Sequence, residues 1–199
     1  VDVSVPHEQQ EELLKHISHQ LAVNSAIPDT SISNLPAISI NTGNHQPLAR
    51  RQYRLPTAWS SAVSEAVDDW LARDRIELGN PMCGWCSPLM AAPKYNTDGS
   101  LDKVRVCIDP SHINDITQVQ ETPIPIIDEI YSSLSGAKVL SSLDLTGGFQ
   151  QVELDQASRD CTSFRWKNTT YRFRVAQWGF RGVPFDFQRR TQALFDSLS

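Results

Sequence analysis

Apolar and basic side chains alternate near the C-terminal end of the chain. Tyr171, Phe173 and Val175 alternate with Arg172 and Arg174. Because successive side chains of a strand point to opposite faces, residues 170–175 are predicted to form a strand with one apolar and one basic face. The turn-forming residues 167–169 precede it, so a partner strand over 162–166 completes a predicted antiparallel hairpin.

Apolar residues at helical spacing predict four helices, over residues 7–21, 57–73, 127–134 and a C-terminal segment that carries Phe187, Leu194 and Leu198. In the second of these we expect four inward-facing side chains: Val63, Val67, Trp70 and Leu71.

Strand signals occur in several further places. Residues 87–93 and 103–108 predict a hairpin around the turn 95–100, and 37–40 predict an edge strand. A strand over 138–143 is expected to pair with 151–154. This mixed order predicts the α+β class, with antiparallel strands and flanking helices.

Charge is unevenly distributed along the chain. Its net charge is −5, but residues 159–199 hold eight Arg and Lys against three Asp, a net +5, whereas the other residues hold ten basic and 20 acidic side chains, a net −10. A basic segment on an acidic body can follow a phosphate backbone, although a solvated basic face is the alternative.

Targeting signals are not evident in the sequence. No apolar run is long enough to cross a membrane, and the first residues lack the features of a signal peptide. We therefore expect an intracellular protein, in the cytoplasm or nucleus, that is processed or is part of something longer because it does not begin with Met.

Cysteines and histidines give weak signals. Cys83 and Cys86 form a C-x-x-C motif, which is open to three interpretations: a redox pair, half of a zinc site, or incidental thiols in a reducing compartment. The five histidines show no ligand spacing, so we expect them at the surface: His7, His16, His19, His45 and His112.

A candidate metal ligand follows the apolar stretch over 138–143. Asp144 stands where this stretch gives way to the Gly147–Gly148 pair, and Phe149 follows. A carboxylate in such a place can hold a divalent ion, and the alternative is a solvated Asp before a turn. Lys94 and Arg105 lie on the predicted hairpin, where two cations could close over a polyphosphate, although exposed hairpins often carry cations.

Six runs, in order, resemble the reverse transcriptase of gypsy-type LTR retrotransposons, from about Ala37 to Ser199. They are Arg51–Pro56, Trp85–Leu89, the run from Asp98 to Asp109, Asn114 with Pro123–Pro125, the run from Leu134 to Leu145, and Gly179, Pro184 and Phe187–Arg189. In register over this length they are highly specific.

The resemblance implies a right-hand polymerase fold. Residues 1–49 would form an N-terminal helix and extended arm, 50–136 the fingers region, and 137–199 the N-terminal half of the palm with returning fingers elements. It also implies two-metal nucleotidyl transfer with Mg²⁺ or Mn²⁺, a template-primer of RNA or DNA, and deoxynucleoside triphosphates as substrates.

The same resemblance assigns roles to individual residues. Asp144 matches the first catalytic aspartate and metal ligand, with the Leu145 carbonyl nearby, and Phe149 matches the ring that excludes a ribose 2′-hydroxyl. The remaining matches are Lys94 and Arg105 for the triphosphate, Trp178 and Gly179 for the nucleotide pocket, and Arg189 for the template path. Arg172 and Arg174, on the basic strand face, are further candidates for nucleic-acid binding.

The sequence departs from the family at several points. Ser111 stands where the family has an arginine that touches template, the fingers hairpin is longer than usual, and Gln177-Trp178-Gly179 replaces Pro-Phe-Gly. The chain ends at Ser199 before the Tyr-x-Asp-Asp hairpin that the family carries.

Three functions stay open on the sequence alone. We expect a reverse transcriptase fragment, or a protein derived from one, that is not catalytically competent alone. The alternatives are a domesticated, non-catalytic nucleic-acid-binding or protein-interaction module, and a different metal-dependent phosphotransferase. A truncated palm would expose apolar surface, so we also expect a further chain or self-association to cover it.

Overall fold

The computed structural model describes residues 7–28, 30–120, 126–138, 142 and 144–196. The chain divides into two compact units, Val1–Ser31 and Ile32–Ser199. In the first unit, helix α1 spans His7–Ser25 and leaves Leu13, Leu14 and Ile17 exposed. The predicted first helix is confirmed and ends four residues later than expected.

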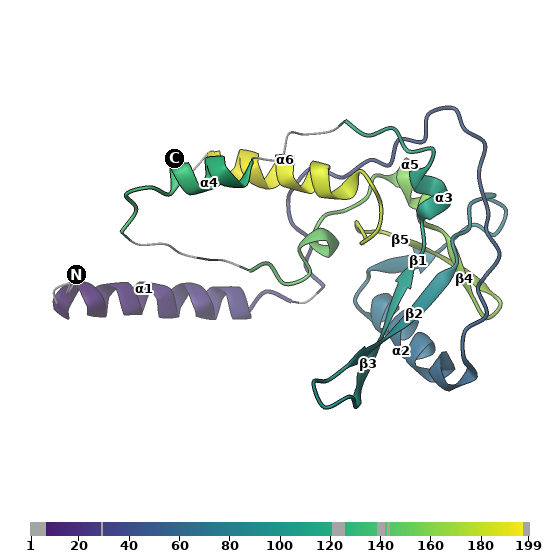
Figure 1. Cartoon of the computed structure of the whole chain (residues 1–199), viewed down its shortest axis with the longest axis horizontal. Helices are drawn as coiled ribbons and strands as arrows, with labels where there is room; N and C mark the ends of the chain where they lie inside the picture. The colour runs from purple at the N-terminus through teal and green to yellow at the C-terminus, as the bar shows by residue number, and fades with distance from the viewer. Residues whose placement is uncertain (1–6, 29, 121–125, 139–141, 143, 197–199) are drawn as a thin grey trace. The chain divides into compact units, whose positions relative to one another are not determined.

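The second unit combines short helices with antiparallel strands (Figure 1). Its helices are η1 (Thr57–Trp59), α2 (Ser60–Ala72), α3 (Ser111–Asn114), α4 (Ile127–Ser133), η2 (Gly148–Gln151), α5 (Gln156–Arg159), η3 (Asp160–Thr162) and α6 (Val183–Asp196). Its strands are β1 (Ile76–Leu78), β2 (Leu89–Tyr95), β3 (Leu101–Ile108), β4 (Phe164–Trp166) and β5 (Thr169–Phe173). The predicted α+β class is confirmed.

A three-stranded sheet of order β1-β5-β4 forms the centre of this unit (Figure 1). The predicted hairpin is confirmed, because β4 pairs antiparallel with β5 from Phe164↔Tyr171 to Trp166↔Thr169. Strand β1, which the sequence analysis does not predict, pairs with the other edge of β5.

The second predicted hairpin is also confirmed, since β2 and β3 pair antiparallel from Leu89↔Ile108 to Tyr95↔Leu101. At the start of β2 the Gln52 side chain acts in place of a neighbouring strand. Its Nε2 donates to the Leu89 carbonyl at 2.7 Å, and its Oε1 accepts from the Leu89 N–H at 2.8 Å.

Helix α2 covers the sheet with its apolar face. Val63 and Val67 are buried, and the Trp70 ring contacts the rings of Phe164 and Phe173 at centroid distances of 6.0 and 5.3 Å. The prediction for Leu71 is wrong: its side chain is 46% exposed. An apolar residue next to the inward face of a helix points partly to solvent, because successive residues are about 100° apart.

The extended arm contributes to the same core. Ile38 and Ile40 are buried, and Ile38 forms a single parallel bridge with Leu154 instead of the predicted longer edge strand. The segment 151–154 bridges to Ile38 and, through Glu153, to Val175. Most of its predicted partner strand, 138–143, lies outside the described residues, as do Pro123–Pro125 and Leu198.

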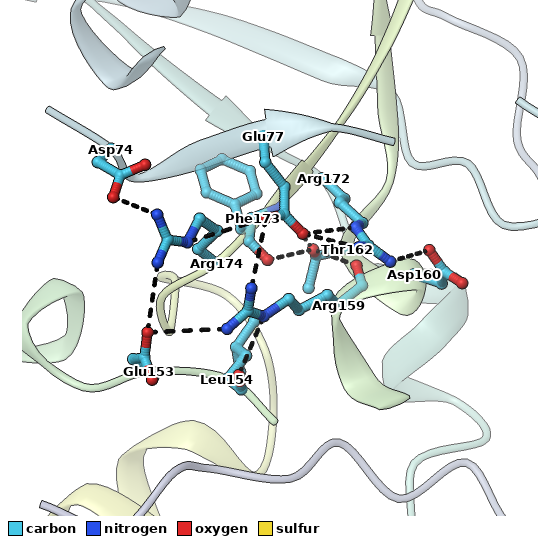
Figure 2. A network of polar contacts seen from close by, with 10 residues as sticks. All are labelled: Asp74, Glu77, Glu153, Leu154, Arg159, Asp160, Thr162, Arg172, Phe173 and Arg174. Atoms are coloured by element: carbon cyan, nitrogen blue, oxygen red, sulfur yellow. Dashed lines mark hydrogen bonds and ion pairs between the residues drawn. The ribbon is translucent and has the colours of Figure 1, made fainter. Parts of the chain in front are cut away.

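The basic face of β5 lies in a network of ion pairs (Figure 2). Glu77 of β1 accepts from the Arg172 guanidinium at 2.8 Å and lies 3.4 Å from Arg159 Nη1. Arg172 also pairs with Asp160, whereas Arg174 pairs with Asp74 and Glu153. In this structure Arg172 of β5 and Arg174, just after the strand, therefore hold strands and helices together, and their predicted contact with nucleic acid stays a prediction.

The expectation that all histidines lie at the surface is wrong for His112, which is 5% exposed. Burial lowers the pKa of its imidazole, and the nearby Arg50 charge acts in the same direction. Backbone groups of Leu48 and Cys86, which are distant in sequence, act on this imidazole and raise its pKa. The four cysteines are free thiols. No helix in the described part of the chain has the length and apolarity needed to span a membrane.

Replacing Glu77 by Gln is expected to reduce the free energy of unfolding by about 2 kcal/mol, between the values typical of exposed and of buried ion pairs. The substitution removes the charge that three arginines share. Urea denaturation measures the loss. The matched control, Asp69→Asn, breaks only the exposed pair with Arg73 and should cost less than about 0.5 kcal/mol. Equal losses would contradict a central role for Glu77.

Asp155 is expected to make stability depend on pH. Burial opposes its charge, but hydrogen bonds from Ser39 and Ser158 outweigh this effect and hold the pKa of Asp155 below its usual value. Its contribution is therefore present above the unfolded-state pKa of about 3.9 and is lost as pH falls through the lower folded-state pKa.

The difference in unfolding free energy between the unchanged chain and Asp155→Asn should be about 1 kcal/mol at pH 6 and vanish toward pH 2. Chemical denaturation across this range measures it. A difference that stays constant with pH would show that the Asp155 charge is not involved.

Candidate functional site

A cavity with a volume of about 810 Å³ lies beside β3. It is lined by residues of α2, by β3 from Lys103 to Ile108, by single residues of β2, η2 and β5, and by two residues that follow β5. The lining residues outside β3 are Ala66, Asp69, Trp70, Ala92, Gln150, Phe173, Gln177 and Trp178. Its size is that of a typical small-molecule site. We call it the β3 cavity.

The β3 cavity brings together two residues that the sequence analysis places in one nucleotide site. Arg105, opposite Ala92 in the hairpin, and Trp178, after β5, both line it. Arg105 is exposed and makes no ion pair with any carboxylate of the described residues. Its guanidinium therefore remains available for an anionic ligand.

Trp178 belongs to a cluster of three aromatic rings with Phe149 and Phe187. Phe149 packs edge-on against Trp178 at a centroid distance of 4.6 Å and against Phe187 at 5.0 Å. Trp178 is 60% exposed, so one part of its ring faces solvent while Phe149 supports it. Gly148 permits this packing, because a Cβ there would lie 3.1 Å from the Phe187 ring.

Trp178 precedes a turn that the side chain of Asn114 holds in place, which we call the Asn114 clamp. Gly179 has a φ of +93°, and a Cβ at this position would lie 3.3 Å from the Pro110 ring. Asn114 Nδ2 donates to the Gly179 carbonyl at 2.7 Å, and Asn114 Oδ1 accepts from the Arg181 N–H at 2.9 Å. Sequence reasoning does not predict this clamp, because Asn114 and Gly179 are 65 residues apart.

Gln177 also lines the cavity, and the sequence does not predict a role for it. Its side chain is buried, and its Oε1 accepts from Gln150 Nε2 at 3.3 Å. Its Nε2 has no hydrogen-bond partner among the described residues. Because a buried donor without an acceptor costs stability, this amide is suited to an acceptor supplied by a ligand.

Lys94 lies outside the lining of the β3 cavity. Its Nζ is 2.7 Å from Asp102 Oδ2 on the facing strand, and this hydrogen bond lowers the pKa of Asp102. The predicted contact of Lys94 with a triphosphate would require it to leave or share this partner, and it stays a prediction.

Asp144 is exposed and lies in irregular backbone, so its surroundings do not resemble a closed metal site. Within the described residues, no group of three His, Cys, Asp or Glu side chains could hold a metal ion. The described residues therefore do not form a two-metal centre, and the role of Asp144 as a ligand for Mg²⁺ or Mn²⁺ stays a prediction. Leu145 lines a separate apolar cavity of about 300 Å³ with Phe187 and Leu194.

Arg189 lies on α6 beside a polar cavity of about 380 Å³. Its Nη1 donates to Gln120 Oε1 at 3.2 Å, and its Nη2 pairs with Asp186. The structure thus joins Arg105, Trp178 and Phe149 in one place and leaves Lys94, Leu145 and Arg189 outside the β3 cavity.

Gly179→Ala is expected to cost about 2 kcal/mol of stability, because an alanine at this positive φ is strained and its Cβ meets Pro110. Gly99 offers a matched control, since its φ is +82° and no atom lies within 4 Å of a Cβ there. Gly99→Ala should therefore cost only about 1 kcal/mol. Urea denaturation compares the two, and equal costs would show that the Pro110 contact is unimportant.

Comparison with known proteins gives two kinds of match. The chain is 33% identical over 169 residues to the retrovirus-related Pol polyprotein from transposon 412 of Drosophila melanogaster, a match that covers 84% of this chain and 14% of the relative. The Pol polyprotein from transposon gypsy of the same organism is 29% identical over 189 residues, which is 94% of this chain and 18% of the relative. No family model matches.

Two solved structures share the fold. The prototype foamy virus protease-reverse transcriptase, as a CSH mutant, superposes with a TM-score of 0.77 at 19% identity and covers 98% of this chain and 26% of that one. The foamy viral enzyme in complex with RNA/DNA hybrid has a TM-score of 0.74 at 19% identity, covering 98% and 25%. The chain spans less than a fifth of the length of these relatives and shares its fold with a viral protease-reverse transcriptase. It thus belongs to the family of gypsy-type retrotransposon Pol polyproteins.

Proposed function

We propose that the chain supplies the nucleotide-binding part of an RNA-directed DNA polymerase, with the incoming deoxynucleoside triphosphate in the β3 cavity. The observation that carries this proposal is that Arg105 and Trp178, which come from separate motifs, line one cavity of suitable size. We assign residues 50–136 to the fingers, 137–199 to the N-terminal half of the palm, and 1–49 to an arm.

Each side chain of the cavity offers one kind of contact. The Arg105 guanidinium can donate two hydrogen bonds to phosphate oxygens in a bidentate fashion. The exposed Trp178 ring offers a face for the base or sugar. Phe149, whose ring packs against Trp178, is proposed to limit the space at the ribose 2′ position. Gln177 Nε2 is a further donor in the lining of the cavity that has no partner among the described residues.

A divalent ion would have only part of its ligands here. We propose Asp144 as one carboxylate ligand for Mg²⁺ or Mn²⁺, with the Leu145 carbonyl nearby. When bound in a polymerase, such ions activate the attacking hydroxyl and stabilise the leaving phosphate oxygens. Because the described residues do not form the complete centre, the roles above are limited to binding and orienting the nucleotide.

Nucleic acid is the second proposed ligand. The foamy viral relative in fold has been solved in complex with RNA/DNA hybrid, and we propose that this chain likewise contacts a template-primer. Arg189 on α6 is the favoured contact, because it is about half exposed. Arg172 and Arg174 would first have to exchange their carboxylate partners. Copying nucleic acid would place the protein in the cytoplasm or nucleus.

A binding experiment tests the assignment of the cavity. The chain is titrated with a deoxynucleoside triphosphate in the presence of a primed RNA template, and affinity is measured by calorimetry. Arg105→Gln should weaken nucleotide binding roughly ten-fold, as expected for the loss of one charge-assisted contact. The control Arg54→Gln removes an exposed charge outside the cavity and should leave the affinity unchanged.

Two further outcomes complete this experiment. Phe149→Ala should narrow the difference in affinity between deoxynucleotides and ribonucleotides, because the ring that limits space at the 2′ position is removed. Unchanged affinity in Arg105→Gln would sink the proposed nucleotide site. If the chain bound the primed template but no nucleotide, a non-catalytic nucleic-acid-binding module would be the better description.

A further inference from the structure

Helix α1 carries an apolar stripe that no described residue of its own unit covers. Every side chain from residue 9 to residue 25 is exposed. Large apolar side chains on one face of the helix have exposed fractions from 43 to 61%: Leu13, Leu14, Ile17 and Leu21. Because they recur at the spacing of a single helical face, they form a continuous stripe. We call it the α1 stripe.

An uncovered helix lacks the main source of helical stability. Most of the stability of a helix in a protein comes from the packing of its apolar face, and an isolated helix of about 15 residues is marginal in water. Helix α1 has 19 residues, and its unit, Val1–Ser31, contains no other helix or strand among its described residues. The α1 stripe therefore requires a surface from outside this unit.

The order of residues along the α1 stripe is the same in both directions. Ile17 stands at the centre, with Leu13 four residues before it and Leu21 four residues after it. Amides end the stripe on the same face, since Gln10 and Asn24 each lie seven residues from Ile17. The α1 stripe is therefore complementary to a reversed copy of itself.

The charges of α1 favour the same arrangement. Glu11 and Glu12 come first along the helix, and the basic side chains follow at Lys15, His16 and His19. A reversed copy brings the acidic residues of each helix toward the basic residues of the other, whereas a parallel copy places like charges side by side. The two helix dipoles also attract each other when the helices are antiparallel. A second copy of this chain thus fits the α1 stripe in charge as well as in apolar pattern.

We propose that α1 pairs with α1 of a second copy of this chain, antiparallel and with Ile17 on the two-fold axis. Leu13 of each copy then packs against Leu21 of the other, as a two-fold interface requires. At both ends, Gln10 of one copy meets Asn24 of the other, and the two amides can exchange hydrogen bonds. This interface goes beyond the proposed function, because no residue that lines the β3 cavity lies on α1.

Sedimentation equilibrium of the whole chain tests the pairing. Between about 1 and about 200 μM the chain should pass reversibly from monomer to dimer, as mass action requires of a short helical interface. Ile17→Gln should weaken dimerisation about ten-fold or more, because each dimer loses two central apolar side chains. A monomer at every concentration would overturn the proposal and assign the α1 stripe to a different partner.

Val23→Gln is the matched control on the same helix. Val23 is 50% exposed and Ile17 is 43% exposed, but Val23 lies about 240° further around the helix and therefore off the α1 stripe. The control should leave dimerisation unchanged, and equal losses in the two variants would overturn the α1 stripe as the interface. The tryptophans all lie in the other unit, so their fluorescence checks that its fold is the same in both variants.

Charges introduced at the two ends of the α1 stripe test the orientation of the helices. The double variant Gln10→Glu, Asn24→Lys places opposite charges across an antiparallel interface and like charges across a parallel one. The comparison variant Gln10→Glu, Asn24→Glu places like charges across both. The first variant should therefore dimerise at least about ten-fold more tightly than the second, because like charges in contact are costly. Equal affinities in the two variants would overturn the antiparallel arrangement.

Discussion

Glu77 is the side chain on which the arrangement of the larger unit depends most. It lies on a strand of three residues and accepts from arginines of β5 and α5, so it joins the edge of the sheet to helix α5. Without this carboxylate the outer face of β5 would present neighbouring cations with too little countercharge. With it, Phe173 on the opposite face of β5 can pack against Trp70. Gln177 and Trp178, a few residues after the strand, then reach the β3 cavity.

Local patterns predict local structure well in this chain, and they fail where distant segments meet. The β4–β5 hairpin follows from alternating side chains within a few residues, but β1 is too short to give a periodic signal, and its Glu77 meets Arg172 across 95 residues. His112 is buried, and the groups that act on its imidazole include Leu48, Arg50 and Cys86, which its own sequence neighbourhood does not contain. The site residues divide in the same way. The family resemblance suggests Arg105 and Trp178, whereas the Asn114–Gly179 hydrogen bond and the unpartnered amide of Gln177 arise from contacts that the sequence does not reveal.

Arginine has two distinct uses in this fold, and the neighbours of each residue decide between them. The guanidinium groups of Arg172, on β5, and Arg174, just after it, are partly buried and meet carboxylates from four other positions, which makes them structural. Arg165 and Arg50 instead meet a carbonyl and a hydroxyl oxygen, which orient a guanidinium without cancelling its charge. Composition alone cannot separate these uses, because both groups lie in or near segments with similar numbers of basic residues.

The amide of Gln52 has a consequence for association between molecules. A strand edge with free N–H and carbonyl groups can recruit a strand from another chain, and the start of β2 would be such an edge. The Gln52 side chain satisfies both groups of Leu89 and ends there, because an amide has no further backbone to continue the ladder. One side chain thus closes this end of the hairpin to sheet extension, and it opposes edge-to-edge aggregation at the point where β2 leaves the core.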